Sequence, residues 1–157
     1  MNIKLIEYDK EYLEYIKKWE EQKEIYEYLT NLRPKYLRKN FSEIREATRF
    51  YMIQYEDVII GATWLEGITK EDAKLTIYIG EKEYRKRGIG TIVVDTLVNI
   101  AFDEINLKKV HLYVRANNSN AINCYKKLGF KIKRQFERQK FKNGSTQGSY
   151  EMVKYKK

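Results

Sequence analysis

The chain has 157 residues, of which 43% are hydrophobic, 34% charged and 14% aromatic, a profile that is typical of one domain and leaves no room for two of full size. Its 31 Lys and Arg against 22 Asp and Glu give a formal net charge of +9, but the lysines are scattered among glutamates, so we expect a phosphate-rich cofactor to be attracted and no nucleic-acid partner. The single Cys124 excludes an intramolecular disulfide, and nowhere do the roughly 20 apolar residues of a bilayer crossing follow one another, so we expect a single domain, residues 1–157, in the cytoplasm with no membrane partner.

The N-terminal quarter is predicted to contain one short strand and two helices. Residues 2–6 alternate as a strand does, and Asp9 can cap the helix that follows. The apolar face of that helix recurs at spacings of four and three residues, at Tyr12, Ile16 and Trp19. Pro34 interrupts the next stretch. A second short helix is predicted to end near Arg49, with Phe41, Ile44 and Ala47 as its apolar residues.

From Phe50 onwards the pattern is that of strands joined by turns and helices. Strands are predicted at 50–55, 58–66, 74–79, 110–114, 130–141 and 150–155. Apolar residues at helical spacing predict helices from 89 to about 105 and over 119–128, the second ending at Gly129. Hairpin turns are expected at Glu56-Asp57 and around Asn143-Gly144. The sequence therefore predicts a mixed sheet packed by helices.

A basic segment with two glycines lies where a predicted strand gives way to a predicted helix, at residues 85–91 (RKRGIGT). Gly88 and Gly90 lack a Cβ atom, so backbone N–H groups there can approach an anion, and the start of the helix adds unpaired donors. The spacing matches neither the Walker motif nor the dinucleotide-binding motif, which disfavours nucleotide hydrolysis and hydride transfer. Taken alone, the segment is equally compatible with a surface turn.

A second motif follows the predicted strand 110–114, at residues 114–130 (VRANNSNAINCYKKLGF). In this order and at this separation, the two segments resemble the GNAT superfamily of N-acetyltransferases. The cofactor signature of that family, Arg/Gln-x-x-Gly-x-Gly/Ala, is matched by Arg85, Gly88 and Gly90. Its later pattern, Asn-x-x-Ala-x-x-x-Tyr-x-x-x-Gly-Phe, is matched by Asn118, Ala121, Tyr125, Gly129 and Phe130. The resemblance is dense over 59–130 and fades before Phe50.

The resemblance implies an α/β (α+β) fold, with a central mixed, mostly antiparallel twisted sheet of about six to seven strands flanked by about four helices. It also implies acetyl-CoA as the acetyl donor, with no metal, lying in a splay between the strand that ends at Ile79 and the strand that ends at Arg115. The pantetheine arm is expected to lie along Ile77, Tyr78 and Ile79. The pyrophosphate is expected on a segment made of Arg85, Lys86, Arg87, Gly88, Ile89 and Gly90, and Asn118 is expected to contact the cofactor beyond the second strand.

The same resemblance implies direct transfer to a primary amine, with Tyr125 as the general acid that protonates the departing thiolate. A phenol has an ordinary pKa of about 10 and therefore keeps its proton at neutral pH. Many relatives carry a Glu on the strand that leads to the cofactor loop, where this chain has Lys74. We therefore expect Glu66, at the end of the preceding strand, to take the proton of the amine, with Glu71 and Asp72 as weaker options.

Histidine and cysteine often take part in catalysis, but here His111 and Cys124 are predicted to have structural roles. A single histidine, His111, cannot make a metal site, and no residue near it has the spacing of a ligand. Cys124 lies on the apolar face of a predicted helix, where a small buried residue is more usual than a nucleophile. We therefore expect no covalent enzyme intermediate.

The acceptor of this predicted transferase is left open. Residues 118–130 and 141–152 are similar to spermidine acetyltransferases and to ribosomal-protein N-terminal acetyltransferases, with aminoglycoside acetyltransferases as a further option. A polycationic acceptor needs acidic side chains, for which the candidates are Glu20, Glu21, Glu24 and Glu27. An anionic acceptor could instead meet Lys35, Arg38 and Lys39, and an aromatic wall for either is available in Tyr26, Tyr28 and Trp64.

A non-catalytic binding function is also compatible with the sequence. The absence of a carboxylate at Lys74 is also compatible with a non-catalytic GNAT-fold module that binds acetyl-CoA or a macromolecular partner. A homodimer formed along a sheet edge is implied by the resemblance alone.

Overall fold

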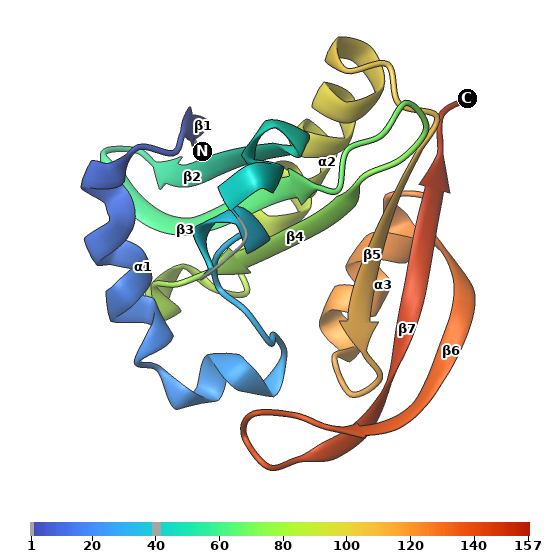
Figure 1. Cartoon of the computed structure of the whole chain (residues 1–157). Helices are drawn as coiled ribbons and strands as arrows, with labels where there is room; N and C mark the ends of the chain where they lie inside the picture. The colour runs from blue at the N-terminus through green and yellow to red at the C-terminus, as the bar shows by residue number, and fades with distance from the viewer. Residues whose placement is uncertain (1, 39–41) are drawn as a thin grey trace.

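The structure, a computed structural model, describes residues 2–38 and 42–157 and is built around a seven-stranded sheet (Figure 1). The strands lie in the order β1-β2-β3-β4-β5-β7-β6. Their bounds are β1 Ile3–Glu7, β2 Thr48–Tyr55, β3 Val58–Glu66, β4 Lys74–Ile79, β5 Lys109–Arg115, β6 Lys131–Lys140 and β7 Thr146–Tyr155. The strands predicted from the sequence are therefore confirmed, and β7 begins earlier than expected.

The helices of the described residues are three α-helices and several shorter helical turns. The α-helices are α1 Leu13–Glu20, α2 Ile89–Asn99 and α3 Ser119–Lys127. The 3-10 turns are η1 Lys10–Tyr12, η2 Lys23–Glu27, η3 Lys35–Leu37, η4 Ser42–Ala47 and η5 Lys82–Tyr84, and a π-helical turn, η6 Ile100–Glu104, continues α2. In this part of the chain no helix combines the length and the apolar character that crossing a bilayer requires.

The region between α1 and β2 contains 3-10 turns in place of the second α-helix that the apolar spacing suggested. The turn η4 occupies Ser42–Ala47, and Phe41, which was expected on its apolar face, lies outside the described residues. Pro34 precedes η3 with a φ of −62° and has no N–H to donate, which favours a short turn over a continuous helix. About four flanking helices were expected, and the fourth is this 3-10 turn.

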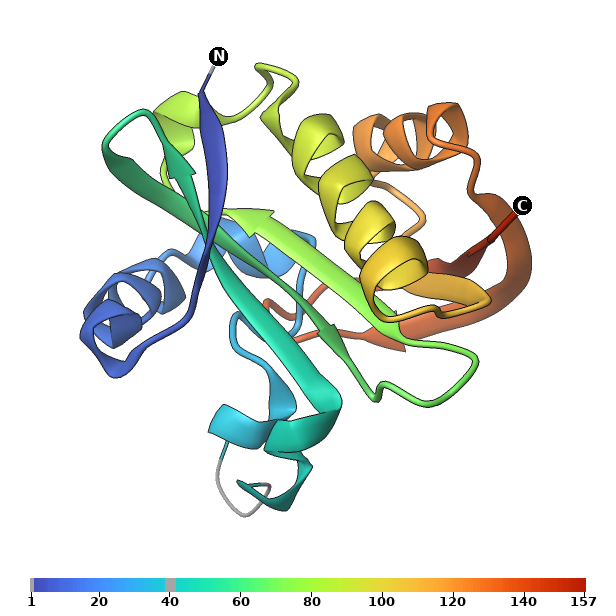
Figure 2. The same ribbon diagram turned by 90° about the horizontal axis from the view of Figure 1, so that it is seen from above.

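Helices cover both faces of the sheet (Figure 2). On one face α2 and α3 pack on the central strands, through Leu97 and Ile122 against Leu75 and Leu112. On the other face α1 and the 3-10 turns pack on β2, β3 and β4, through aromatic and aliphatic side chains that include Ile16, Trp19, Trp64 and Tyr78. Because β3 is buried from both sides, its sequence is almost continuously apolar.

The strands β4 and β5 are parallel, whereas the other neighbouring strands are antiparallel. Their ladder aligns one residue pair only, Lys74 with His111. Beyond that pair the two strands diverge toward their ends at Ile79 and Arg115 (Figure 1). The splay that the resemblance implied is therefore present.

Gly80, the residue after β4, packs closely against Trp19 of α1. Trp19 is fully buried, and a Cβ atom built on Gly80 would lie 2.2–2.4 Å from atoms of its indole ring. The indole N–H donates to the carboxylate of Glu81, and the amide of Gln22 donates to the carbonyl oxygen of Gly80 at 2.9 Å. A side chain at residue 80 is excluded by this contact.

The first prediction concerns this contact. We expect Gly80→Ala to lower the free energy of unfolding by about 1–3 kcal/mol, because the added methyl group overlaps the buried indole. Thermal and denaturant unfolding measure the change. The matched control is Gly90→Ala, where an added Cβ meets nothing within 4 Å and the stability should stay equal or rise slightly. Equal stability of the two variants would contradict the packing described here.

Candidate active site

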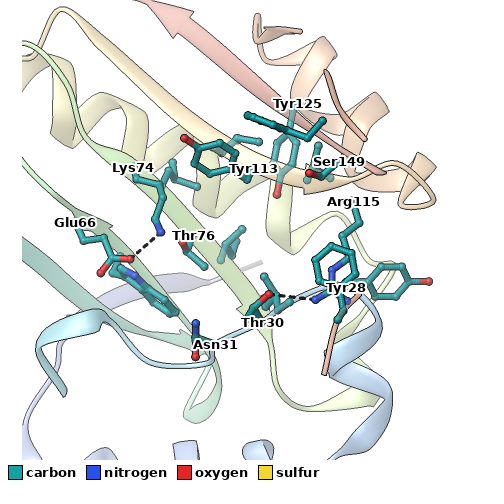
Figure 3. A pocket seen from close by; sticks show the side chains of 18 of the residues that line it. Tyr28, Thr30, Asn31, Glu66, Lys74, Thr76, Tyr113, Arg115, Tyr125 and Ser149 are labelled. Atoms are coloured by element: carbon teal, nitrogen blue, oxygen red, sulfur yellow. Dashed lines mark hydrogen bonds and ion pairs between the residues drawn. The ribbon is translucent and has the colours of Figure 1, made fainter. Parts of the chain in front are cut away.

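Two cavities open where β4 and β5 diverge. The larger, of about 780 Å³, lies between the diverging strands and the starts of α2 and α3. The smaller, of about 410 Å³, lies between the same strands, the 28–31 segment and the hairpin of β6 and β7 (Figure 3). The two cavities share the lining residues Tyr28, Leu29, Ile77, Tyr113, Val114 and Tyr125. They therefore meet at one place, beside the second motif.

The larger cavity gathers all but one of the residues that were expected to bind a cofactor. It is lined by Ile77, Tyr78, Ile79, Arg85, Lys86, Gly88, Ile89, Gly90 and Asn118. The exception is Arg87, whose guanidinium carbon lies 5.1 Å from the centroid of the Tyr84 ring. That these residues bind a cofactor stays a prediction.

The helix α2 begins at the larger cavity with a glycine at its N-cap. Gly88 has a φ of +81°, in the left-handed region that glycine adopts readily, and no side chain caps the first turn. The first N–H groups of the helix therefore have no intrahelical acceptor. A Cβ atom at Gly88 or Gly90 would meet nothing within 4 Å, so the backbone borders open space. A pyrophosphate fits this arrangement of donors and space.

The side chain of Arg85 stabilises the loop instead of lying free in the cavity. Its Nε donates to the carbonyl oxygen of Ile79 at 2.8 Å, and its Nη2 donates to Oε1 of Gln22 at 3.0 Å and to the carbonyl oxygen of Gly80 at 3.3 Å. The guanidinium thus links the end of β4 to the segment that follows α1.

At Tyr78 the backbone of β4, and not the side chain, borders the larger cavity. The Tyr78 side chain points to the opposite face, where its hydroxyl donates to the carbonyl oxygen of Leu32 at 2.8 Å. Burial there raises the pKa of Tyr78 well above its ordinary value. In the described residues β5 pairs with β4 only at Lys74, so the edge of β4 beyond that residue has no strand partner on the β5 side.

Asn118 has a structural role at the other wall of the larger cavity. Its Oδ1 accepts a hydrogen bond from the Ala121 N–H at 3.3 Å, which makes Asn118 the N-cap of α3. Asparagine is among the preferred residues at that position. The residue therefore fixes the start of the helix that carries Tyr125.

Tyr125 lies where the two cavities meet. Its ring packs against that of Phe130 at 5.9 Å between centroids, and its hydroxyl makes no hydrogen bond within the part of the chain that the structure describes. Burial, and to a smaller extent the neighbouring Cys124 thiol, raise the pKa of Tyr125 well above its ordinary value. The phenol therefore keeps its proton at neutral pH and can donate it.

Glu66 lines the smaller cavity with both carboxylate oxygens engaged (Figure 3). Oε2 accepts from the Lys35 backbone N–H at 2.9 Å, and Oε1 pairs with the Lys74 ammonium at 3.2 Å. Burial acts to raise the pKa of Glu66, but the Lys35 N–H and the Lys74 charge outweigh it, so the pKa is lowered. The carboxylate is ionised at neutral pH and is a weaker base than an unperturbed one.

Arg115 is a residue of this site that the sequence analysis did not single out. It ends β5, is 4% exposed, and lines the smaller cavity. Its guanidinium donates to the Tyr26 carbonyl oxygen and to Thr30 Oγ1, and lies 3.7 Å from the centroid of the Phe141 ring. The signal in the sequence was a charged residue directly after the apolar Val114, at the end of the strand and next to the Asn-rich part of the second motif.

The other chemistry-bearing residues are engaged in local contacts. The ring of His111 contacts Asp72 through Nδ1 at 2.9 Å, and the Cys124 thiol contacts the Thr91 hydroxyl at 3.0 Å. Among residues 2–38 and 42–157, no group of three or more His, Cys, Asp or Glu side chains is arranged to hold a metal ion.

Comparison with known proteins gives a family match over most of the chain. Residues 8–130 match the model of a family described as "Acetyltransferase (GNAT) family". The chain is also similar to a "Probable N-acetyltransferase san" from Drosophila melanogaster, at 34% identity over 82 residues, which are 50% of this chain and 44% of that protein. It is similar to a "Spermidine N(1)-acetyltransferase" from Escherichia coli, at 31% identity over 70 residues, which are 45% of this chain and 38% of that protein.

A third curated relative, an "N-alpha-acetyltransferase" from Sulfurisphaera tokodaii, is 46% identical over 50 residues, or 32% of this chain and 30% of that protein. The chain thus spans less than half the length of each of these three relatives. Among solved structures, the fold matches a spermidine N-acetyltransferase from Vibrio cholerae in complex with CoA and spermine, with a TM-score of 0.82 at 22% identity, over 98% of this chain and 95% of that one.

The second prediction concerns the first turn of α2. We expect Gly90→Ala to weaken the binding of CoA by roughly tenfold, which corresponds to about 1.4 kcal/mol, because the methyl group enters the space beside the unpaired N–H groups. Titration calorimetry with CoA measures the affinity, and thermal unfolding of the same variant shows that the fold is intact. Unchanged affinity would mean that the phosphates do not lie at this turn.

Proposed function

The chain belongs to the acetyltransferase (GNAT) family, and on that premise we propose that it transfers the acetyl group of acetyl-CoA to a primary amine. The observation that carries this proposal is the position of Tyr125, a partly buried phenol with an unbonded hydroxyl in the described residues, where two cavities meet. One cavity has the donors and space that a pyrophosphate needs, and the other is lined by polar side chains. We propose that residues 1–157 act as one catalytic domain.

We propose that the larger cavity holds acetyl-CoA. The N–H groups of Gly88, Ile89 and Gly90 would bind the pyrophosphate, with the nearby Lys86 adding positive charge. The backbone of Ile77 to Ile79 would bind the pantetheine arm along the unpaired edge of β4. Arg85 supports this site through its bonds to the end of β4, and Asn118 through its cap on α3. Arg87 would act only through its charge.

Tyr125 is proposed as the general acid of the transfer. When bound, acetyl-CoA supplies the acetyl group and a thiolate leaving group. The new bond joins the amine nitrogen to the acetyl carbon, and the bond to sulfur breaks. The Tyr125 hydroxyl is free of protein partners in the described residues, so it can donate its proton to the sulfur that leaves. Its raised pKa keeps that proton in place at neutral pH.

Glu66 is proposed as the group that takes the proton of the amine, through water. It is the only carboxylate that lines the smaller cavity in the described part of the chain. Its lowered pKa keeps it ionised and therefore able to accept a proton, although Lys74 and the Lys35 N–H reduce its basicity. A primary amine has an ordinary pKa of about 10.4, so this proton must be lost before the nitrogen can attack.

The names of the relatives support an amine as the acceptor. One is named for transfer to α-amines and another for transfer to spermidine. The solved neighbour is in complex with CoA and spermine. The shared feature is a primary amine, and this is the acceptor class that we propose.

A non-catalytic module that binds acetyl-CoA is the second candidate. The observation that favours it is the ion pair of Glu66 with Lys74, which leaves no unpaired carboxylate in the smaller cavity within the described residues. A thiol-release assay with acetyl-CoA, with and without amines, separates the two. Release that depends on an amine supports the enzyme, and CoA binding without release for any amine supports the module.

The third prediction tests the role of Tyr125 as the general acid. We expect Tyr125→Phe to lower kcat by about 10²–10⁴-fold and to leave the affinity for CoA unchanged, because the ring packing is kept and only the proton donor is lost. Thiol-release kinetics and calorimetry measure the two quantities. The matched control is Tyr155→Phe, the same change at a tyrosine that is 59% exposed at the end of β7. Full activity of Tyr125→Phe would remove this residue from the mechanism.

The fourth prediction concerns pH. Since the pKa of Tyr125 is raised above its ordinary value of about 10, the acid form persists throughout the range in which the enzyme can be assayed. We therefore expect kcat to show no decline between neutral pH and about pH 9.5 from loss of this proton. A pH profile at saturating substrates measures it. A decline with a midpoint below pH 9 that vanishes in Tyr125→Phe would contradict the raised pKa of Tyr125.

A further inference from the structure

The charges of the smaller cavity favour an anion. Its charged lining residues, in the part of the chain that the structure describes, are Arg38, Glu66, Lys74 and Arg115. The negative charge of Glu66 is balanced by Lys74 at 3.2 Å. Arg38 and Arg115 then remain without a carboxylate among these lining residues. The surplus charge of the cavity is positive, which repels a second ammonium group and attracts a carboxylate.

A buried donor of this cavity has no acceptor. The Nε–H of Arg38 is buried and makes no hydrogen bond within residues 2–38 and 42–157. Buried N–H groups are seldom left unpaired, because water is no longer available to them. Arg38 lines the smaller cavity, so a carboxylate of a bound molecule can pair with its guanidinium there. The indole N–H of Trp64, in contrast, is directed at the Glu66 carboxylate, whose pKa it helps to lower.

The acidic residues that could receive a polyamine lie elsewhere. Glu20 forms a double hydrogen bond with Arg33, at 2.6 and 2.9 Å, and Glu24 is paired with Lys82. Glu27 lines the larger cavity. Glu21 follows α1 and is exposed. None of these four glutamates lines the smaller cavity.

The basic and aromatic residues that were candidates for acceptor binding are placed differently from these glutamates. Arg38, Tyr28 and Trp64 do line the smaller cavity, whereas Tyr26 does not, and its hydroxyl donates to the Glu20 carbonyl oxygen at 3.0 Å. Lys35 contributes its backbone N–H to Glu66, and Lys39 lies outside the described residues. The smaller cavity thus combines an apolar aromatic wall with donors and positive charge.

We propose that the acceptor is a primary amine that also carries a carboxylate, an inference that rests on the transferase function proposed above. The carboxylate would be bound by Arg38, and the amine would point toward Tyr125 where the cavities meet. The transfer itself is unchanged. The ammonium loses one proton to solvent through Glu66, the nitrogen bonds to the acetyl carbon, and the carbon–sulfur bond breaks. The sulfur takes the proton of Tyr125, which is replaced by the second proton that the nitrogen loses. The substituent at the far end of the acceptor sets the specificity.

Three acceptors of equal length test this inference: γ-aminobutyrate, putrescine and butylamine, which end in a carboxylate, an ammonium and a methyl group. Shorter and longer amino carboxylates are included, because the distance from amine to carboxylate must match the cavity. We expect the best amino carboxylate to exceed putrescine and butylamine by at least about tenfold in kcat/KM. Equal or higher kcat/KM for putrescine would overturn the inference.

One variant locates the carboxylate. We expect Arg38→Gln to raise KM for the best amino carboxylate by roughly tenfold and to leave KM for butylamine unchanged, because butylamine offers no oxygen to this guanidinium. Arg138→Gln, the same loss of charge at an exposed position of β6 outside both cavities, is the matched control. Thermal unfolding of Arg38→Gln shows that the fold is intact. Equal effects on both amines would overturn the assignment.

Binding separates this inference from the function on which it rests. Calorimetric titration of the same three amines into the protein with CoA needs no turnover. If no amine is acetylated, the proposed function fails, and tighter binding of the amino carboxylate than of putrescine still supports the carboxylate site. If putrescine is acetylated and binds more tightly, the transferase stands and this inference is overturned.

Discussion

The divergence of β4 and β5 after a single parallel pair is the constraint on which the site depends. In a parallel pair both strands end at the same edge of the sheet, so the loops that follow them are brought together. The chain after β4 leads to Gly88 and α2, and the chain after β5 leads to Asn118 and α3. Since the ladder stops at Lys74 and His111, the space between the strands is left to side chains and to a ligand. Two motifs that are distant in the sequence thereby line one cavity.

The N-terminal region completes both cavities, and it is held there by polar contacts made to the ends of the same two strands. Arg115 reaches from the end of β5 to the carbonyl oxygen of Tyr26, and Arg85 reaches from the loop after β4 to Gln22. The indole of Trp19 covers Gly80 between them. A buried guanidinium is expensive to desolvate and is retained only where its donors are used. The segment that carries Tyr28 and Leu29, which line both cavities, is fixed by these contacts.

The strands and the cofactor segment were predictable because their signals are local. Alternation of apolar residues located β4 to the residue, and the glycines at 88 and 90 marked the helix start that borders the larger cavity. The 3-10 turns of the N-terminal region were not predictable, since their shape follows from packing against Trp64 and Tyr78 of distant strands. The same holds for Arg115, whose acceptor at Tyr26 lies 89 residues away. The pairing of Glu66 with Lys74 follows from the register of β3 and β4, which an irregular connection over 67–73 hides from the sequence.

Opposite pKa shifts favour opposite roles in the proposed transfer for Tyr125 and Glu66, which both line the smaller cavity. At Tyr125 the surroundings are apolar and the hydroxyl has no partner in the described residues, so burial holds the proton on. At Glu66 an N–H donor and an ammonium group stabilise the anion more than burial destabilises it, so the proton is held off. A pair of groups whose environments move their pKa values apart is the usual arrangement of an acid and a base that act at the same pH. The position of Lys74 makes this separation possible, because the cation that weakens Glu66 as a base also keeps it charged inside a largely buried site.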